Sequence, residues 1–117
     1  MKKRLAGFEE LVLLATASLG EEAYGVTVQQ RLEAETGSAV ALGAVYAVLD
    51  RLERKGYVRS AWGEATPRRG GRRKRMFHVT APGHTALRAM GRIRLRLARP
   101  INSKGGTEWY LRHSVLR

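Results

Sequence analysis

Two short β-strand patterns around a loop of glycine, proline and arginine constrain the fold of this chain more than any other feature. Residues 57–62 and 73–79 are rich in β-forming side chains, and Pro67, Gly70 and Gly71 lie between them. Two such runs joined by a loop of this kind are typical of a β-hairpin. Because most of the remaining chain has helical periodicity, the sequence predicts a mainly α fold with a small β-hairpin.

Three helices are predicted before the hairpin. Apolar residues recur at helical spacing in residues 8–19 and again in residues 26–36. Gly20 and Gly37 directly follow these two segments, at the position where glycine commonly ends a helix. The third helix, at residues 43–55, has the clearest pattern of the three.

This third helix is amphipathic. Its apolar face consists of Val45, Val48, Leu49 and Leu52. The opposite face carries Gly43, Ala47, Asp50, Arg51 and Arg54, with Tyr46 on the flank. Small residues on an exposed face allow the helix backbone to approach a partner closely, and the arginines can reach phosphates or guanine edges.

A fourth helix is predicted after the hairpin, at about residues 81–97. Thr80 is a suitable N-cap, Pro82 lies in the first turn, and Pro100 ends the segment. The residues after Pro100 have no clear periodicity. The expected organisation is an N-terminal domain at residues 1–80, a C-terminal helix at 81–99 and a tail at 100–117.

The composition narrows the class of partner. The formal net charge is +12 over 117 residues, which favours a polyanion such as DNA, RNA or an anionic membrane surface. No apolar run approaches the roughly 20 residues of a transmembrane helix, and the N-terminus lacks the pattern of a signal peptide. The expectation is therefore a soluble, cytoplasmic protein that does not insert into a membrane.

Sites for catalysis or metal binding are not predicted. The chain has no cysteine, which rules out disulfides and thiolate metal ligands. Its histidines, at His78, His84 and His113, are scattered and have no accompanying carboxylate cluster. Neither a G-x-S-x-G motif nor a phosphate-binding P-loop occurs. We expect no enzymatic activity, no metal and no cofactor.

The order of elements, with a basic hairpin after three helices, is that of a winged helix-turn-helix. The chain resembles the PadR family of bacterial transcriptional regulators. The matching segments are FEELVLL (8–14), AYGV (23–26), LGAVY (42–46), LDRLERKGYV (49–58), GGRRKR (70–75) and VTA (79–81). The resemblance rests on their order and spacing and covers roughly residues 8–90.

The chain departs from the family pattern in two places. Ala41 stands where relatives often have Ser or Thr before the third helix, and an Ala cap gives up about 1 kcal/mol of helix stabilisation. Many relatives also carry one or more long C-terminal helices that build a dimer. Here a single helix follows the hairpin and Pro100 ends it.

The resemblance implies a sequence-specific transcriptional regulator, a repressor, that binds a palindromic operator in double-stranded DNA as a homodimer. The third helix would read bases in the major groove, and the arginine-rich hairpin would contact the backbone or the minor groove. The DNA-binding residues expected are Gly43, Tyr46, Ala47, Asp50, Arg51, Arg54, Arg68, Arg69, Arg72, Arg73, Lys74 and Arg75. The dimerisation residues expected are Leu11, Leu14, Leu87, Met90, Ile93 and Leu97.

Individual side chains have alternative roles. Asp50 could orient Arg54 at i+4 or accept a hydrogen bond from a cytosine amino group. Tyr46 could pack or contact a phosphate, whereas Tyr24 and Trp62 are expected to pack.

A different class of function also fits the sequence. A basic RNA-binding or ribosome-associated winged-helix protein would carry the same charge and fold. A dimer on a defined duplex would support the regulator, and a monomer that prefers structured RNA would support the alternative. A small-molecule effector is not identified by the sequence.

Overall fold

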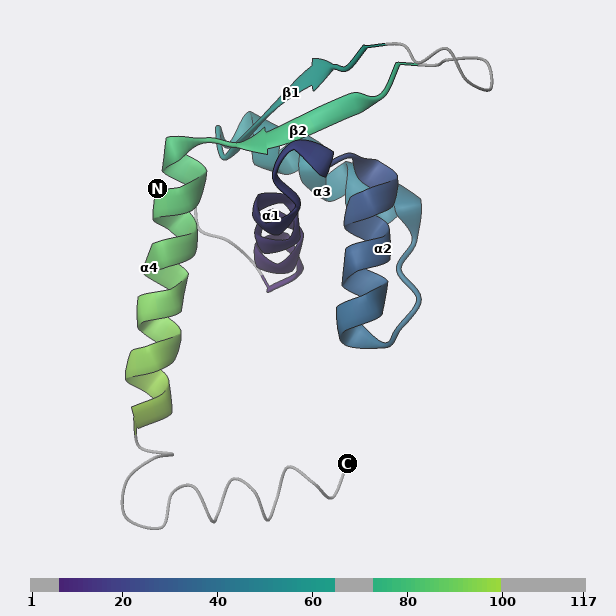
Figure 1. Cartoon of the computed structure of the whole chain (residues 1–117). Helices are drawn as coiled ribbons and strands as arrows, with labels where there is room; N and C mark the ends of the chain where they lie inside the picture. The colour runs from purple at the N-terminus through teal and green to yellow at the C-terminus, as the bar shows by residue number, and fades with distance from the viewer. Residues whose placement is uncertain (1–6, 65–72, 100–117) are drawn as a thin grey trace. The chain divides into compact units, whose positions relative to one another are not determined.

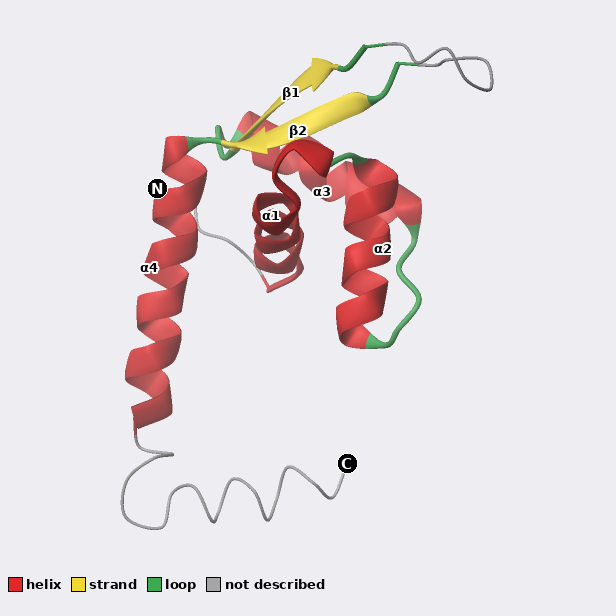
Figure 2. Cartoon of the chain, in the orientation of Figure 1, coloured by secondary structure: helices red, strands yellow, loops and turns green. Residues whose placement is uncertain are grey.

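Four α-helices, one 3-10 turn and a two-stranded hairpin make up the described part of the chain. The structure is a computed structural model that describes residues 7–64 and 73–99. The elements are α1 (Gly7–Leu19), η1 (Gly20–Glu22), α2 (Gly25–Thr36), α3 (Leu42–Arg54), β1 (Val58–Trp62), β2 (Arg75–Val79) and α4 (Ala81–Ala98) (Figure 1, Figure 2). The predicted order of helices and strands is confirmed, and so is the winged helix-turn-helix fold class.

The chain divides into two compact units. The first is Met1–Leu87 and the second is Arg88–Arg117, so the boundary falls inside α4. The first unit holds α1 to α3 and the hairpin, and β1 and β2 lie side by side next to α3 (Figure 1). None of the described helices is long and apolar enough to cross a membrane.

The core of the first unit is built from three helices and one face of the hairpin. Its fully buried side chains include Val12, Leu13, Val28, Val45, Leu49, Leu52 and Phe77. Val45, Val48, Leu49 and Leu52 of α3 are all at most 2% exposed, so the apolar face predicted for this helix is confirmed. Burying such aliphatic side chains stabilises the fold by about 1.5–3 kcal/mol each.

The first helix is apolar on two sides. Val12 and Leu13 are fully buried. Thr16 is buried beside them, and its hydroxyl donates to the Val12 carbonyl at 2.7 Å. Leu11 and Leu14 lie on the other side of α1 and are 44% and 52% exposed. A helix in a single small core needs only one apolar face, so the first unit leaves the second face of α1 uncovered.

Glycines follow α2 and α3, and the one after α2 was predicted to end that helix. Gly37 caps α2 in the left-handed region, at φ 71°, and its N–H donates to the Glu33 carbonyl at 2.9 Å. Gly56 follows α3 with φ 84°. Both positions favour glycine because a Cβ is disfavoured at such φ values.

The connection between α2 and α3 compensates for a missing cap. Ala41 is the N-cap of α3 and makes no side-chain cap hydrogen bond, as the sequence predicts. The preceding residue is held from α2 instead. Gln29 donates to the Val40 carbonyl at 2.7 Å, and the Val40 N–H donates to the Glu33 carboxylate at 2.8 Å.

The hairpin is anchored at its base. The antiparallel register pairs Val58 with Val79 at one end and Trp62 with Arg75 at the other. The N–H of Phe77 also donates to the Ala23 carbonyl at 2.9 Å, so β2 is bonded on both edges. The strands begin one and two residues later than predicted, and the loop residues 65–72 lie outside the described part of the chain.

The start of α4 is fixed to the turn before β1. Thr80 is its N-cap, as predicted: the Thr80 hydroxyl accepts from the Gly83 N–H at 3.2 Å and donates to the Gly56 carbonyl at 2.6 Å. Gly83 is buried, and a Cβ there would overlap the Tyr57 carbonyl. The first turn of α4 is therefore packed directly on the base of the hairpin.

Candidate nucleic-acid interface

The exposed face of α3 begins with small residues. Gly43, Ala44 and Ala47 are all exposed, and a Cβ placed on Gly43 would meet nothing within 4 Å. Arg54 lies on the same face at the end of the helix and is exposed. Among the described residues no ion pair or side-chain hydrogen bond engages Arg54. We call these four residues the α3 face.

Arg51 lies toward α1 rather than in the middle of the α3 face. Its Nε donates to the Glu9 carboxylate at 3.2 Å, and Lys55 Nζ donates to the same carboxylate at 2.7 Å. The Glu9 side chain is only 7% exposed. A buried carboxylate needs such partners because its desolvation is costly. Arg51, predicted as a DNA contact, is therefore held at the edge of the face and is half exposed.

Tyr46 packs against α2. Gly25 is buried in the first turn of α2, and a Cβ on it would overlap the Tyr46 ring. The ring thus fills the space that the missing side chain of Gly25 leaves. Of the two roles open for Tyr46, the structure shows packing, and a phosphate contact of its hydroxyl stays a prediction.

We call the hairpin with its loop, residues 58–79, the wing. In the described part of its basic run, Arg73 donates to the Gly63 carbonyl at 2.9 Å. Lys74 donates to the Tyr24 hydroxyl at 3.3 Å and lies 4.5 Å from the centre of that ring. Arg68, Arg69 and Arg72, also predicted as DNA contacts, lie outside the described residues.

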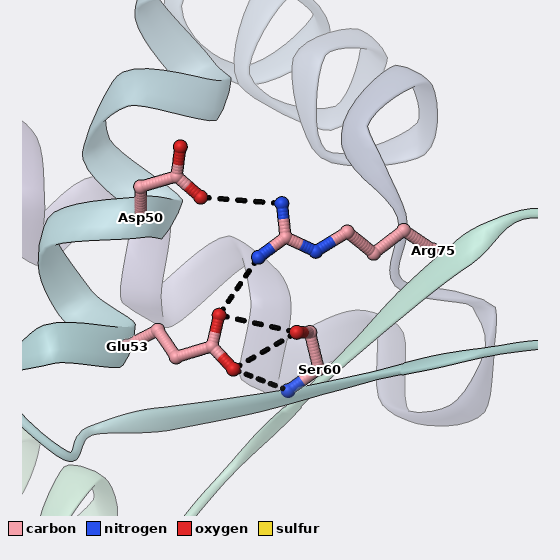
Figure 3. Close-up of polar contacts among 4 residues, drawn as sticks. All are labelled: Asp50, Glu53, Ser60 and Arg75. Atoms are coloured by element: carbon pink, nitrogen blue, oxygen red, sulfur yellow. Dashed lines mark hydrogen bonds and ion pairs between the residues drawn. The ribbon is translucent and has the colours of Figure 1, made fainter.

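Arg75 differs from the other cations of the wing because it turns back to α3. Its two terminal nitrogens donate to Asp50 at 3.2 Å and to Glu53 at 2.8 Å (Figure 3). Its guanidinium also lies 4.9 Å from the centre of the Phe77 ring. Asp50 therefore pairs with Arg75 across the domain, and the structure does not show the i+4 contact with Arg54 that the sequence suggested.

Glu53 joins α3 to both strands of the wing. Its carboxylate accepts from the Ser60 N–H at 3.1 Å and from the Ser60 hydroxyl at 2.9 Å, in addition to Arg75 (Figure 3). Burial raises the pKa of Glu53, but the two hydrogen bonds from Ser60 and the charge of Arg75 outweigh it and hold the pKa below its ordinary value. Glu53, Ser60 and Glu9 were not predicted as site residues, because partners 7 to 46 residues apart leave no signal in the spacing of the sequence.

Trp62 was predicted to pack, and this was wrong. It is 61% exposed, at the outermost register pair of the hairpin opposite Arg75. A β-forming aromatic residue fits a strand pattern equally well at a covered or an uncovered end.

The residues predicted for dimerisation fall in both units. Leu11 and Leu14 are exposed on α1, and Leu87 at the end of the first unit is half-buried. In the second unit Met90 and Ile93 are half-buried, and Leu97 is exposed. In residues 7–64 and 73–99, no three or more His, Asp or Glu side chains are grouped to hold a metal ion.

Comparison with known sequences identifies the family. The family described as "Transcriptional regulator PadR-like family" matches residues 13–89, which is most of the chain. The chain belongs to the PadR-like family. Members of this family are transcription regulators and not enzymes, so this PadR-like protein is a DNA-binding transcriptional regulator. No curated protein sequence matches it.

Solved structures share the fold of this PadR-like protein. A PadR-like transcription factor from Bacteroides fragilis is 23% identical, with a TM-score of 0.68 over 81% of this chain and 86% of that one. A transcriptional regulator from Clostridium thermocellum is 21% identical, with a TM-score of 0.64 over 82% and 88%. A PadR family regulator from Clostridium difficile is 18% identical, with a TM-score of 0.64 over 82% and 96%.

Proposed function

We propose that this PadR-like protein is a sequence-specific repressor that binds a palindromic operator as a homodimer. The α3 face carries the proposal, because Gly43, Ala44 and Ala47 leave the helix backbone accessible beside the exposed Arg54. The major groove of B-DNA admits one α-helix, and an arginine can donate two hydrogen bonds to the O6 and N7 atoms of guanine. In this proposal α3 reads bases and Arg54 supplies the strongest polar contact.

The wing supports the same orientation on DNA. Arg73 and Lys74 are exposed at its described end, and Arg68, Arg69 and Arg72 add three cations in its loop. Such a basic hairpin can follow the phosphate backbone or enter a narrow minor groove. The net charge of +12 would strengthen binding and make it sensitive to salt.

The homodimer is supported by uncovered apolar surface. Leu11 and Leu14 on α1, with Leu97 on α4, are large aliphatic side chains exposed to solvent in the single chain. In this proposal residues 1–80 bind DNA, residues 81–99 contribute to the dimer and residues 100–117 form a tail. A two-fold dimer would place two α3 helices about 34–36 Å apart, which suits a palindrome in the bacterial cytoplasm. Repression follows if the bound dimer occludes a promoter.

Selection from a pool of random duplexes, followed by titration at several salt concentrations, tests the proposal. We expect a palindromic consensus and a steep fall of log K against log salt. If each protomer neutralises ~4 phosphates, the slope is about −3.6 per protomer. A slope near zero, or a preference for structured RNA over every duplex, would contradict the proposal.

A further inference from the structure

Four side chains tie α3 to the wing by hydrogen bonds and ion pairs. Asp50 and Glu53 lie one turn apart on α3, Ser60 comes from β1, and Arg75 comes from β2 and extends toward the helix (Figure 3). Five hydrogen bonds of 2.8 to 3.2 Å join them. We call these four residues the clamp.

The net charge of the clamp does not favour binding to DNA. Arg75 supplies one positive charge, and Asp50 and Glu53 supply two negative charges, so the three together carry a net charge of −1. The Arg75 side chain is 32% exposed and is occupied on both terminal nitrogens. Arg73 and Lys74, next to it in the sequence, are exposed and bear no ion pair to an acidic side chain of the described chain. Of these three neighbouring cations, Arg75 is therefore the one that pairs with acidic side chains of the protein itself.

The wing needs such a tie. A two-stranded hairpin is at best marginally stable alone. In the described part of the chain, the outer edge of β2 is joined to the helical core through the Ala23 carbonyl and the bridge of Tyr24 to Met76. The clamp adds a link from the outer half of β2 to α3. A planar guanidinium can bond two carboxylates at once, which a lysine ammonium on a flexible stem does with much less geometric constraint.

We propose that Arg75 is a positioning residue, which with Asp50, Glu53 and Ser60 fixes the wing relative to α3 so that both reach DNA together. The proposal rests on the DNA binding proposed above and assigns Arg75 and Asp50 a role different from direct contact. Affinity gained in this way comes from pre-organisation, since the wing is ordered before DNA arrives. The clamp therefore strengthens binding although it adds negative charge near a polyanion.

Two substitutions distinguish a positioning role of the clamp from a direct contact with DNA, because the two roles predict different changes in DNA affinity. Glu53→Gln removes a negative charge, which by electrostatics alone would raise DNA affinity. Loss of the clamp lowers it. Arg75→Lys keeps the charge that a phosphate contact needs but cannot bridge Asp50 and Glu53 in the same geometry. We expect both variants to bind the selected operator about tenfold more weakly, and the double variant to bind no more weakly than either one.

The salt dependence gives an independent measure. A residue that contacts a phosphate contributes about 0.9 to the slope of log K against log salt. We expect Arg73→Gln to make the slope shallower by about that amount and Arg75→Lys and Glu53→Gln to leave it unchanged. Glu64→Gln is the matched acidic control, since Glu64 is exposed in the wing and has no clamp partner; we expect it to bind as tightly as the wild type or more tightly.

Amide hydrogen exchange tests the clamp without DNA. We expect faster exchange of the Ser60 amide and of the β2 amides in Glu53→Gln and Arg75→Lys than in Arg73→Gln, with α1 and α2 unchanged as evidence of folding. The proposal is overturned if Glu53→Gln binds more tightly, if Arg75→Lys binds like the wild type, or if exchange in the wing is unaltered. A wild type that binds no duplex at all overturns the proposed function instead, and faster wing exchange in the variants would then still show the clamp as a structural tie.

Discussion

Arg51 and Arg54 lie one turn apart on the same helix but are placed differently. Arg51 is bonded to the buried Glu9, so contact with DNA would have to compete with that carboxylate. Arg54 is exposed and, in the described part of the chain, has no such competitor. A guanidinium without an acidic partner can turn two donors toward a base, whereas the charge of a paired one is partly compensated by the carboxylate and its rotation is restricted.

Arg54→Ala should therefore reduce operator binding more than Arg51→Ala. We expect a loss of about 1–3 kcal/mol for Arg54→Ala and relaxed specificity at one base pair, as for a base-reading arginine. Arg51→Ala should cost less than this. Titration of both variants against the operator and against single-base variants measures the difference. Equal losses on operator and random DNA for Arg54→Ala would mean that Arg54 contacts only the backbone.

Two glycines on neighbouring helices should respond oppositely to alanine. Gly25→Ala forces a Cβ into the Tyr46 ring, and overpacking of this kind typically costs about 1–3 kcal/mol of the free energy of unfolding. Gly43→Ala enters open space in a helix, where alanine is favoured by up to about 1 kcal/mol. Thermal unfolding of both variants tests this. A loss of DNA binding by the stable Gly43→Ala would show that close backbone approach matters.

At the scale of elements, the contact between α3 and the wing should depend on pH. The pKa of Glu53 is lowered in the folded state, so its contribution to stability is complete above its unfolded pKa and is lost as pH falls through the lower folded pKa. The unfolded pKa of a glutamate is about 4.3. The stability advantage of the wild type over Glu53→Gln should thus be constant near pH 7 and vanish in acid. Thermal unfolding of both proteins at a series of pH values below 7 measures it, and an advantage that does not decrease as the pH is lowered would contradict this assignment.

The elements were predictable where their signals are local. The face of Val45, Val48, Leu49 and Leu52 follows from periodicity, and Thr80 follows from the chemistry of a helix start. The pairs Glu9–Lys55 and Asp50–Arg75 were not predictable, because they lie 46 and 25 residues apart and depend on how α1 and the wing pack on α3. The roles of Arg51 and Arg75 inside the structure were missed for the same reason.

At the scale of the whole molecule, dimer formation should depend on the apolar side chains predicted for the interface on α1 and α4. Leu14→Glu places a charge on the exposed apolar side of α1, and Ile93→Glu places one among the half-buried side chains of α4. We expect the wild type to be a dimer at micromolar concentration by light scattering, and each variant to shift toward monomer and lose operator affinity. Leu95→Glu is the control for α4, because Leu95 is exposed and is not one of the residues predicted for the dimer interface.

A monomeric wild type that binds a single half-site tightly would contradict the dimer. A dimer that survives both substitutions would place the interface elsewhere. Circular dichroism of each variant distinguishes loss of the interface from loss of folding.

The two apolar sides of α1 also bear on how the sequence can drift during evolution. Val12 and Leu13 face the chain's own core, so any folded descendant must keep their size and polarity. Leu11 and Leu14 are under no such constraint from the core. If they are nevertheless as restricted as their buried neighbours among natural variants, selection acts on them through another molecule. Substitution patterns along a single helix would thus separate the demands of folding from those of assembly.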